Sequence, residues 1–269
     1  EALNGNFMTA VRLREEALKN AQKPSEKLSH LSNLTDFYGM MGDVASAERA
    51  LREAEGIFEQ LGMASRKRGL KMDLYVAQIE RARGAYALLG GNMALAESHY
   101  LQAAKGWEAK LAESDDGEVS ERRLARRSAV AAMAATYRRA AKAISRQGRL
   151  VDAEVLLRET LGKVVRLAGG RSTITLGVVN DLANSAIEQG RAREAAKLAN
   201  YTISSLEAAG VTANSSFLIH ARQNLAASYV IQGKWQEALN AFEESRRNVG
   251  DIELQSQLAS GTRAWVQAL

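Results

Sequence analysis

The chain of 269 residues contains no cysteine and a single proline, Pro24. The absence of cysteine excludes disulfide bonds, thiolate catalysis and zinc–thiolate sites. It does not determine the cellular compartment, so we take the cytoplasm as the default. The sequence also lacks any apolar run of the roughly 18 residues that a membrane span requires. We therefore expect no membrane as a partner.

The sequence offers few groups for catalysis or metal binding. No two of its three histidines, His30, His99 and His220, have the spacing of metal ligands. The acidic pair Asp115-Asp116 stands between Ser114 and Gly117, which is typical of a solvated turn. No glycine-rich phosphate loop follows a predicted strand. These observations predict a protein that is not an enzyme and that has no cofactor and no metal.

The sequence is instead rich in helix-forming residues arranged in a repeated pattern. Residues 224–247 contain two apolar stripes at helical spacing, which are separated by Gly233. The first stripe comprises Leu225, Ala226, Tyr229 and Val230, and the second comprises Ala238, Leu239, Ala241 and Phe242. This pattern predicts two amphipathic helices that fold back on one another at the glycine.

The same arrangement, a glycine followed five residues later by alanine, recurs along the chain. It is found at Gly42/Ala47, Gly91/Ala96, Gly148/Ala153, Gly190/Ala195 and Gly233/Ala238, and Gly5/Ala10 has the same spacing. Glycine ends a helix at low cost because it adopts a left-handed conformation without strain. Alanine fits where two helices cross too closely for a larger side chain. We therefore expect a helical hairpin at each repetition.

The hairpin around Gly233 resembles a tetratricopeptide repeat, because Leu225, Ala226, Tyr229, Ala238 and Phe242 occupy positions of that family's signature. Arg222 replaces the usual tryptophan, and Gly250 stands where proline is expected. This resemblance implies an all-α, right-handed superhelical solenoid of antiparallel helix pairs. The turn glycines are separated by 49, 57, 42 and 43 residues, against about 34 in the standard repeat. Helices longer by roughly a turn make the chain similar to kinesin light chains and bacterial repeat arrays.

We predict one solenoid over residues 1–269, which contains five hairpins and a partial repeat at each end. The hairpins are expected at 25–62, 64–113, 119–168, 174–209 and 214–248, and the partial repeats at 1–22 and 250–269. Ser25, after Lys23-Pro24, is the expected N-cap of the first hairpin. The partial repeats lead us to expect that the natural protein continues in both directions.

The resemblance implies that the first helices of the hairpins line a concave groove. The residues predicted to contact a peptide there are Arg81, Arg138, Lys142, Asn180, Asn184, Gln223 and Asn224. Asparagine can both donate to and accept from an extended backbone, and arginine can bind a carboxylate through two nitrogens. The alternative is that these residues form ordinary solvated helix faces. The family's clamp for a C-terminal carboxylate is matched only in fragments, so binding of chaperone tails is not expected.

Positive charge is concentrated between Ser120 and Arg149, where nine basic residues face one acid, Glu121, in a chain of net charge +5. The predicted basic patch comprises Arg122, Arg123, Arg126, Arg127, Arg139 and Arg146, next to Arg138, Lys142 and Arg149. This density favours an acidic partner. Nucleic acid is the less favoured alternative, because Tyr137 is the only aromatic residue in the patch.

The predicted function is non-catalytic binding of a protein or peptide segment, expected to be acidic, along the concave groove. The ligand could also be another domain of the same full-length chain. A competing hypothesis is a regulatory sensor region fused to an effector, as in caspase-like CHAT proteases or bacterial transcription activators with similar repeats. A third is nucleic-acid binding through the basic patch at 120–149.

Overall fold

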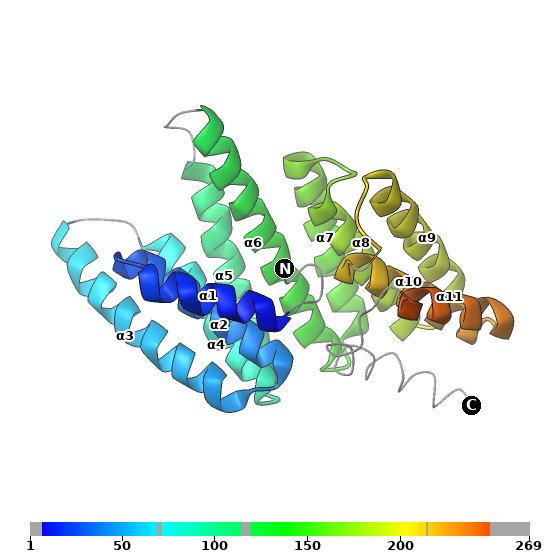
Figure 1. Ribbon diagram of the computed structural model, residues 1–269, viewed down its shortest axis with the longest axis horizontal. Helices are drawn as coiled ribbons and strands as arrows, with labels where there is room; N and C mark the ends of the chain where they lie inside the picture. Colours follow the sequence, from blue (N-terminus) through cyan, green and yellow to red (C-terminus); the bar gives the residue numbers. More distant parts are fainter. Residues whose placement is uncertain (1–6, 69–71, 114–118, 214, 248–269) are drawn as a thin grey trace. The chain divides into compact units, whose positions relative to one another are not determined.

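The computed structural model describes residues 7–68, 72–113, 119–213 and 215–247 (Figure 1). These residues form eleven helices in packed antiparallel pairs and contain no strand. The helices are α1 (Phe7–Asn20), α2 (Pro24–Met41), α3 (Val44–Arg68), α4 (Asp73–Leu89), α5 (Met93–Glu113), α6 (Val119–Ser145), α7 (Leu150–Ala168), α8 (Thr173–Glu188), α9 (Ala192–Ala208), α10 (Ser216–Ile231) and α11 (Trp235–Arg247). None of them is both long and apolar enough to cross a membrane.

The chain divides into two compact units, one comprising Met8–Ala153 and the other beginning at Glu154. In the first unit, α2 packs against both α3 and α4. Its apolar core contains Leu28, Leu31, Leu34 and Ile79, each no more than 2% exposed, and Leu18 of α1 packs against the same core. The stripe of leucines three residues apart on α2 explains why this helix is buried on one side.

Helices α4 and α5 of the first unit cross very closely, because two glycines lie at their interface. A Cβ on Gly84 would lie 2.9 Å from the ring of the fully buried Tyr100. A Cβ on Gly106 would lie 2.8 Å from both the Asp73 carbonyl oxygen and the Ala77 Cβ. Glycine is therefore required at both positions for the observed packing, and alanine there would push the two helices apart.

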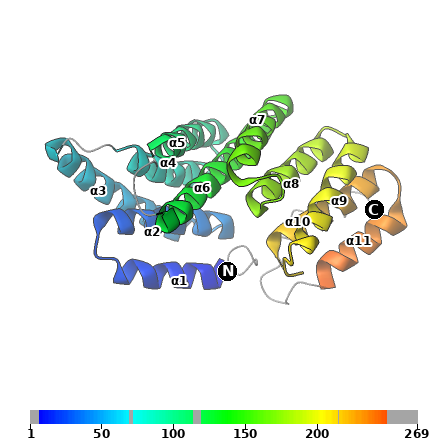
Figure 2. The same ribbon diagram turned by 90° about the horizontal axis from the view of Figure 1, so that it is seen from above.

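In the second unit, α8, α9, α10 and α11 pack in succession, and α8 also contacts α10 (Figure 2). The core of this unit includes Leu176, Leu206 and Leu218, which are all completely buried. Each of these leucines lies on a different helix, so one apolar cluster holds α8, α9 and α10 together.

The predicted turns are confirmed. The glycines at 42, 91, 148, 190 and 233 all have positive φ, between 69° and 81°. The alanines five residues later, Ala47, Ala96, Ala153, Ala195 and Ala238, are at most 3% exposed. After Gly190 the Arg191 amide donates to the Ala186 carbonyl, and after Gly233 the Lys234 amide donates to the Tyr229 carbonyl. These bonds satisfy carbonyls at the helix ends.

Two predicted helix boundaries are wrong. Helix α3 continues to Arg68 instead of ending at residue 62, and α4 begins at Asp73 instead of residue 64. No proline interrupts the chain after Gly62, so the first helix extends. The predicted N-cap Ser25 is also wrong, because α2 begins at Pro24 and Lys23 is its N-cap. Proline is favoured at the first helical position, where no amide hydrogen is needed.

Several predictions lie outside the described residues. They concern the partial repeat at 250–269, Gly5 in the first partial repeat, and the loop at 114–117. Within the described part, the first partial repeat is represented by α1, which begins at Phe7.

Glycine-to-alanine substitutions at two exposed positions should have opposite effects on stability. Gly148 has a φ of 81° and Gly56 lies inside α3, and a Cβ at either would meet nothing within 4 Å. We expect Gly148→Ala to destabilise the protein by about 1 kcal/mol, because alanine is strained at positive φ. We expect Gly56→Ala to stabilise it by about 0.5–1 kcal/mol, because alanine is the better helix former. Urea unfolding of the two variants measures both; a loss of stability in Gly56→Ala or none in Gly148→Ala would contradict the assigned turns.

Candidate partner-binding surface

We call the surface formed by the first helix of each hairpin the first-helix face. In the Met8–Ala153 unit it is made by α2, α4 and α6, and a cluster of charged side chains joins these helices. The Asp36 Oδ2 atom of α2 lies 3.7 Å from Nε of Arg81 on α4 and 3.3 Å from Nη2 of Arg139 on α6. Arg139 also reaches Met40 of α2, at 3.5 Å from the sulfur. The three helices are thus linked by side chains rather than separated by solvent.

Arg81, predicted to contact a ligand, is largely buried in this cluster. Its side chain is 11% exposed, and its Nη2 donates to Asn33 Oδ1 at 2.9 Å. Burial lowers the pKa of the Arg81 guanidinium, and the negative charge of Asp36 opposes that effect. Arg81 therefore lies beneath the first-helix face, where it is held by two side chains of α2.

The other basic residues of α6 differ in exposure. Lys142 and Arg146 are exposed and Arg138 is half-buried, and the three follow one another at four-residue spacing. This spacing places them on the same side of the helix. Nearer the start of α6, Arg123, Arg126 and Arg127 are exposed. The helix contains Arg122, but its side chain is outside what the structure describes.

In the second unit the first-helix face is made by α8 and α10, and it contains the four predicted amide residues. Asn224 donates from Nδ2 to both the backbone oxygen and Oδ1 of Asn180, at 3.0 Å each. Asn180 is buried, whereas Asn184 is exposed and donates to Glu188. The Nε2 atom of Gln223 is buried without a hydrogen-bond partner. Asn180 and Asn224 are thus brought together, with one amide positioning the other.

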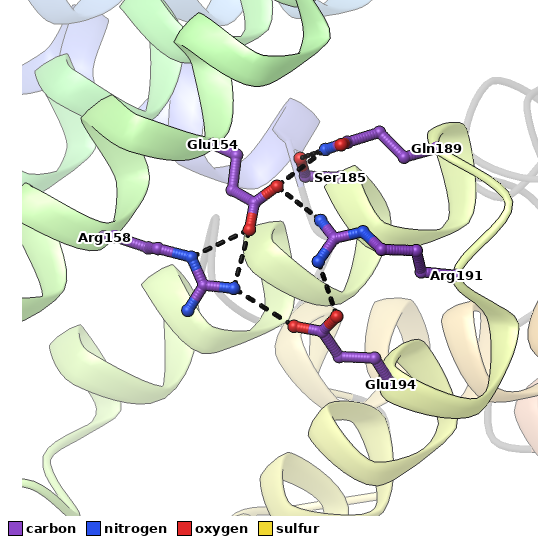
Figure 3. A network of polar contacts seen from close by, with 6 residues as sticks. All are labelled: Glu154, Arg158, Ser185, Gln189, Arg191 and Glu194. Atoms are coloured by element: carbon purple, nitrogen blue, oxygen red, sulfur yellow. Dashed lines mark hydrogen bonds and ion pairs between the residues drawn. The ribbon is translucent and has the colours of Figure 1, made fainter.

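A network of polar contacts that the sequence did not reveal surrounds Glu154 of α7 (Figure 3). The carboxylate of Glu154 accepts hydrogen bonds from Gln189 Nε2 and Arg158 Nε, both at 2.8 Å, and also from Arg191. Arg158 and Arg191 in turn bind Glu194 of α9. The network attaches the turn between α8 and α9 to the preceding helix α7.

The same arrangement occurs at the turn between α6 and α7. There Gln147 Nε2 donates to Glu97 at 2.8 Å, and Arg149 Nη1 lies 2.9 Å from the same carboxylate. In both cases a Gln-Gly-Arg turn binds a glutamate that stands six residues after the preceding turn glycine. We call each such set a rung. The recurrence of Gln-Gly-Arg at 147–149 and 189–191 is the sequence signal that would have revealed it.

Glu154 is held as an anion. Burial by itself would raise the pKa of Glu154. Hydrogen bonds from Gln189 and Arg158, together with the charge of Arg191, outweigh burial and lower this pKa below its ordinary value.

The histidines of the first unit have partners of other kinds. His99 Nδ1 lies 2.6 Å from Glu80, and His30 Nδ1 lies 3.2 Å from Arg14. Across the described ranges, no group of three histidine, aspartate or glutamate side chains is arranged to hold a metal ion.

Comparisons with known proteins identify the class. A sequence model described as "Tetratricopeptide repeat" matches residues 218–247, which comprise most of α10 and all of α11. A search of curated proteins finds no significant match. The crystal structure of BtubC (BKLC) from P. vanneervenii has a TM-score of 0.61 at 18% identity, over 90% of this chain and 91% of that chain. A putative kinesin light chain from Podosopora anserina with nearly identical TPR-like repeats has a TM-score of 0.51 at 19% identity, over 85% and 97%.

These results confirm the predicted fold class. The chain folds as a tetratricopeptide-like, all-α solenoid similar to kinesin-light-chain arrays, and it has a tetratricopeptide repeat at 218–247. Such repeats generally act as scaffolds for protein–protein interaction and are typically non-catalytic.

Removing the charge of a rung glutamate should destabilise the protein. We expect Glu154→Gln to cost about 1.5–3 kcal/mol, because hydrogen bonds to a charged acceptor contribute about that much. Glu159→Gln on the same helix is the control, since Glu159 is exposed, and it should change stability by less than about 0.5 kcal/mol. Equal effects of the two substitutions in urea unfolding would contradict a structural role for the rung.

The same pair of proteins should differ in pH dependence. Because the pKa of Glu154 is lowered in the folded state, its contribution to stability is present above the ordinary glutamate pKa of about 4.3 and is lost as pH falls through the folded value. The stability difference between the unchanged protein and Glu154→Gln should therefore be largest near neutral pH and should shrink in acid. A difference that is constant between pH 7 and pH 3 would contradict this assignment.

Proposed function

We propose that the protein binds an extended acidic segment of a partner protein along the first-helix face, without catalysis. The observation that carries this proposal is the row of basic side chains Arg138, Lys142 and Arg146 on one side of α6. Arg146 is exposed and has no ion-pair partner within the described part of the chain. A row of positive charge at this spacing suits acidic side chains of an extended chain lying across the helix.

The first-helix face of the second unit offers, by itself, recognition of a partner's backbone through the amide residues of α8 and α10. An extended segment has free amide and carbonyl groups, and asparagine can bind both. Asn184 is exposed, and Asn224 is oriented by its bonds to Asn180. A partner segment that supplies backbone carbonyls would satisfy such donors.

Arg81 has a different role in this proposal from that of Arg138 and Lys142. Its side chain is mostly buried against Asp36 and Asn33 of α2. In the proposal Arg81 therefore holds α2 and α4 together beneath the first-helix face and does not contact the partner. The predicted ligand contacts in this unit are then Arg138 and Lys142, with Arg146 beside them.

Binding of nucleic acid remains a second candidate, and the exposed residues Arg123, Arg126 and Arg127 favour it. Phosphate groups bind clustered arginines whatever the base sequence, and such binding weakens steeply as salt increases. The described part of α6 offers one aromatic residue for base stacking, Tyr137, and it is 6% exposed. The protein-segment proposal is therefore preferred.

Charge reversal on α6 tests the proposal. Peptides selected from a displayed library for binding to the protein should be enriched in aspartate and glutamate. We expect Arg138→Glu with Lys142→Glu to weaken the selected peptides by about 2–4 kcal/mol, because hydrogen bonds to charged groups contribute roughly 1.5–3 kcal/mol each and are not additive. This corresponds to roughly 30- to 800-fold in Kd. The exposed charge of Lys142 should contribute only about 0–1 kcal/mol to folding. Urea unfolding checks that the double variant is folded, because Arg138 is half-buried.

The matched control is Arg126→Glu with Arg127→Glu, which makes the same charge change on the same helix. Its effect on the selected peptides should be less than about fivefold, or roughly 1 kcal/mol. If both double variants weaken the peptides equally, binding is diffuse electrostatic attraction. If Arg138 and Lys142 can be reversed without loss, the proposed surface is not the binding site. A duplex RNA or DNA that binds more tightly than any selected peptide would favour nucleic acid.

A further inference from the structure

Helix α1 is attached to the first unit by an apolar stripe and by two polar contacts with α2. Val11 of α1 is part of the apolar core cluster of this unit, and Leu18 packs against it. Beside the stripe, the hydroxyl of Tyr38 donates to Glu15 at 2.6 Å. The other polar contact involves a histidine, the side chain that titrates nearest to neutral pH.

The contact between Arg14 of α1 and His30 of α2 requires a neutral imidazole. Nη1 of Arg14 lies 3.2 Å from Nδ1 of His30, and both side chains are half-buried. A guanidinium group stays charged and can only donate hydrogen bonds. Nδ1 is therefore the nitrogen without a proton, which accepts the bond, and the single ring proton is on Nε2.

A second proton on His30 would remove this contact and replace it with a repulsion. Both ring nitrogens of an imidazolium are donors, so Nδ1 could no longer accept from Arg14. Two positive charges would then face one another at the distance of the former hydrogen bond, in a partly buried place where water screens them less. Protonation therefore acts directly against the attachment of α1 to α2.

The surroundings of His30 favour the neutral ring. Burial lowers the pKa of His30, and the charge of Arg14 lowers it further. Glu26, one turn earlier on α2, opposes both effects, but its carboxylate is 46% exposed and also pairs with Lys23. No charged group in the described parts of α3 and α4, which pack against α2, acts on His30. The pKa of the folded ring is thus below its ordinary value of about 6.5.

We propose that the contact between Arg14 and His30 is an acid-sensitive clasp, which loosens α1 from α2 as pH falls below neutral. When α1 is released, His30 regains its ordinary affinity for protons, so acid favours the released state. The contribution of the clasp is complete above about pH 6.5 and is lost as pH falls through the value of the folded ring. Release of α1 uncovers the part of the apolar core next to Val11 and Leu18.

Hydrogen exchange followed by NMR at pH 7.5 and pH 5.0 tests the clasp. The protection of α1 amides is expressed relative to that of α8 amides in the same sample, which removes the pH dependence common to all amides. We expect the relative protection of α1 to fall by roughly threefold or more at pH 5.0, because the released state then binds an additional proton.

Two histidine variants assign this effect to its residue. His30→Gln does not titrate but keeps an oxygen that can accept from Arg14, so the relative protection of α1 should be equal at the two pH values. His99→Gln is the matched control, because His99 is on α5 and contacts Glu80. It should keep the full pH dependence of α1. A pH dependence that persists in His30→Gln, or that is absent from the unchanged protein, would overturn the proposal.

The titration of His30 itself provides a second readout. The chain has three histidines, so the His30 ring resonance is assigned by its loss in His30→Gln. We expect its midpoint to rise in Arg14→Met, which removes the cation and keeps an apolar stem. An unchanged or lower midpoint would contradict the clasp, and this holds even if His30→Gln loosens α1 at both pH values. Charge reversal of Arg138 and Lys142 should change neither readout, so the clasp and the binding of a partner segment are tested separately.

Discussion

Every hairpin depends on the close crossing of two helices beside a turn that only glycine adopts without strain. The turn glycines hold φ between 69° and 81°, and the alanine five residues later is buried at the crossing. A larger side chain at the alanine would separate the helices, and a residue with a Cβ at the glycine would strain the turn. Both constraints concern small residues and short spacings, so each hairpin is specified locally. The order of turns and helices along the chain then determines which helices form the first-helix face.

At four of the five hairpin turns, the residue immediately after the glycine has one of two roles. At Asp43 and Asn92 its side-chain oxygen accepts from the amide three residues on, at 3.0 and 3.1 Å, and so caps the second helix. At Arg149 and Arg191 the side chain cannot accept such a bond, and it binds a glutamate of the preceding hairpin instead. A cap stabilises its own helix, whereas a rung stabilises the contact between successive repeats. The residue after the turn glycine therefore stabilises either its own helix, as a cap, or the contact with the preceding hairpin, as part of a rung.

This difference between local and non-local constraints explains what the sequence could predict. The turns and the buried alanines follow from spacing, and the match of residues 218–247 to the tetratricopeptide repeat agrees with the signature around Tyr229 and Phe242. The boundary of α3 was missed because no residue near Gly62 stops a helix. The burial of Arg81 was missed because Asp36, its partner, lies 45 positions earlier in the sequence, and no local pattern reports that pairing. The rung at Glu154 depends in the same way on Gln189 and Arg191, more than thirty positions later.

The uneven distribution of rungs has a consequence for cooperativity. Glu48, at the equivalent position of the first hairpin, pairs with Arg52 of its own helix. The residue six positions after Gly190 is Ala196, which cannot form a rung. In a repeat protein, stability is close to a sum of intrinsic terms and nearest-neighbour coupling terms. Coupling through carboxylate rungs is then available where Glu97 and Glu154 stand and is missing at the outer hairpins. Amide hydrogens of α11 would accordingly exchange by local opening, while those of α5 and α7 would exchange with larger cooperative units.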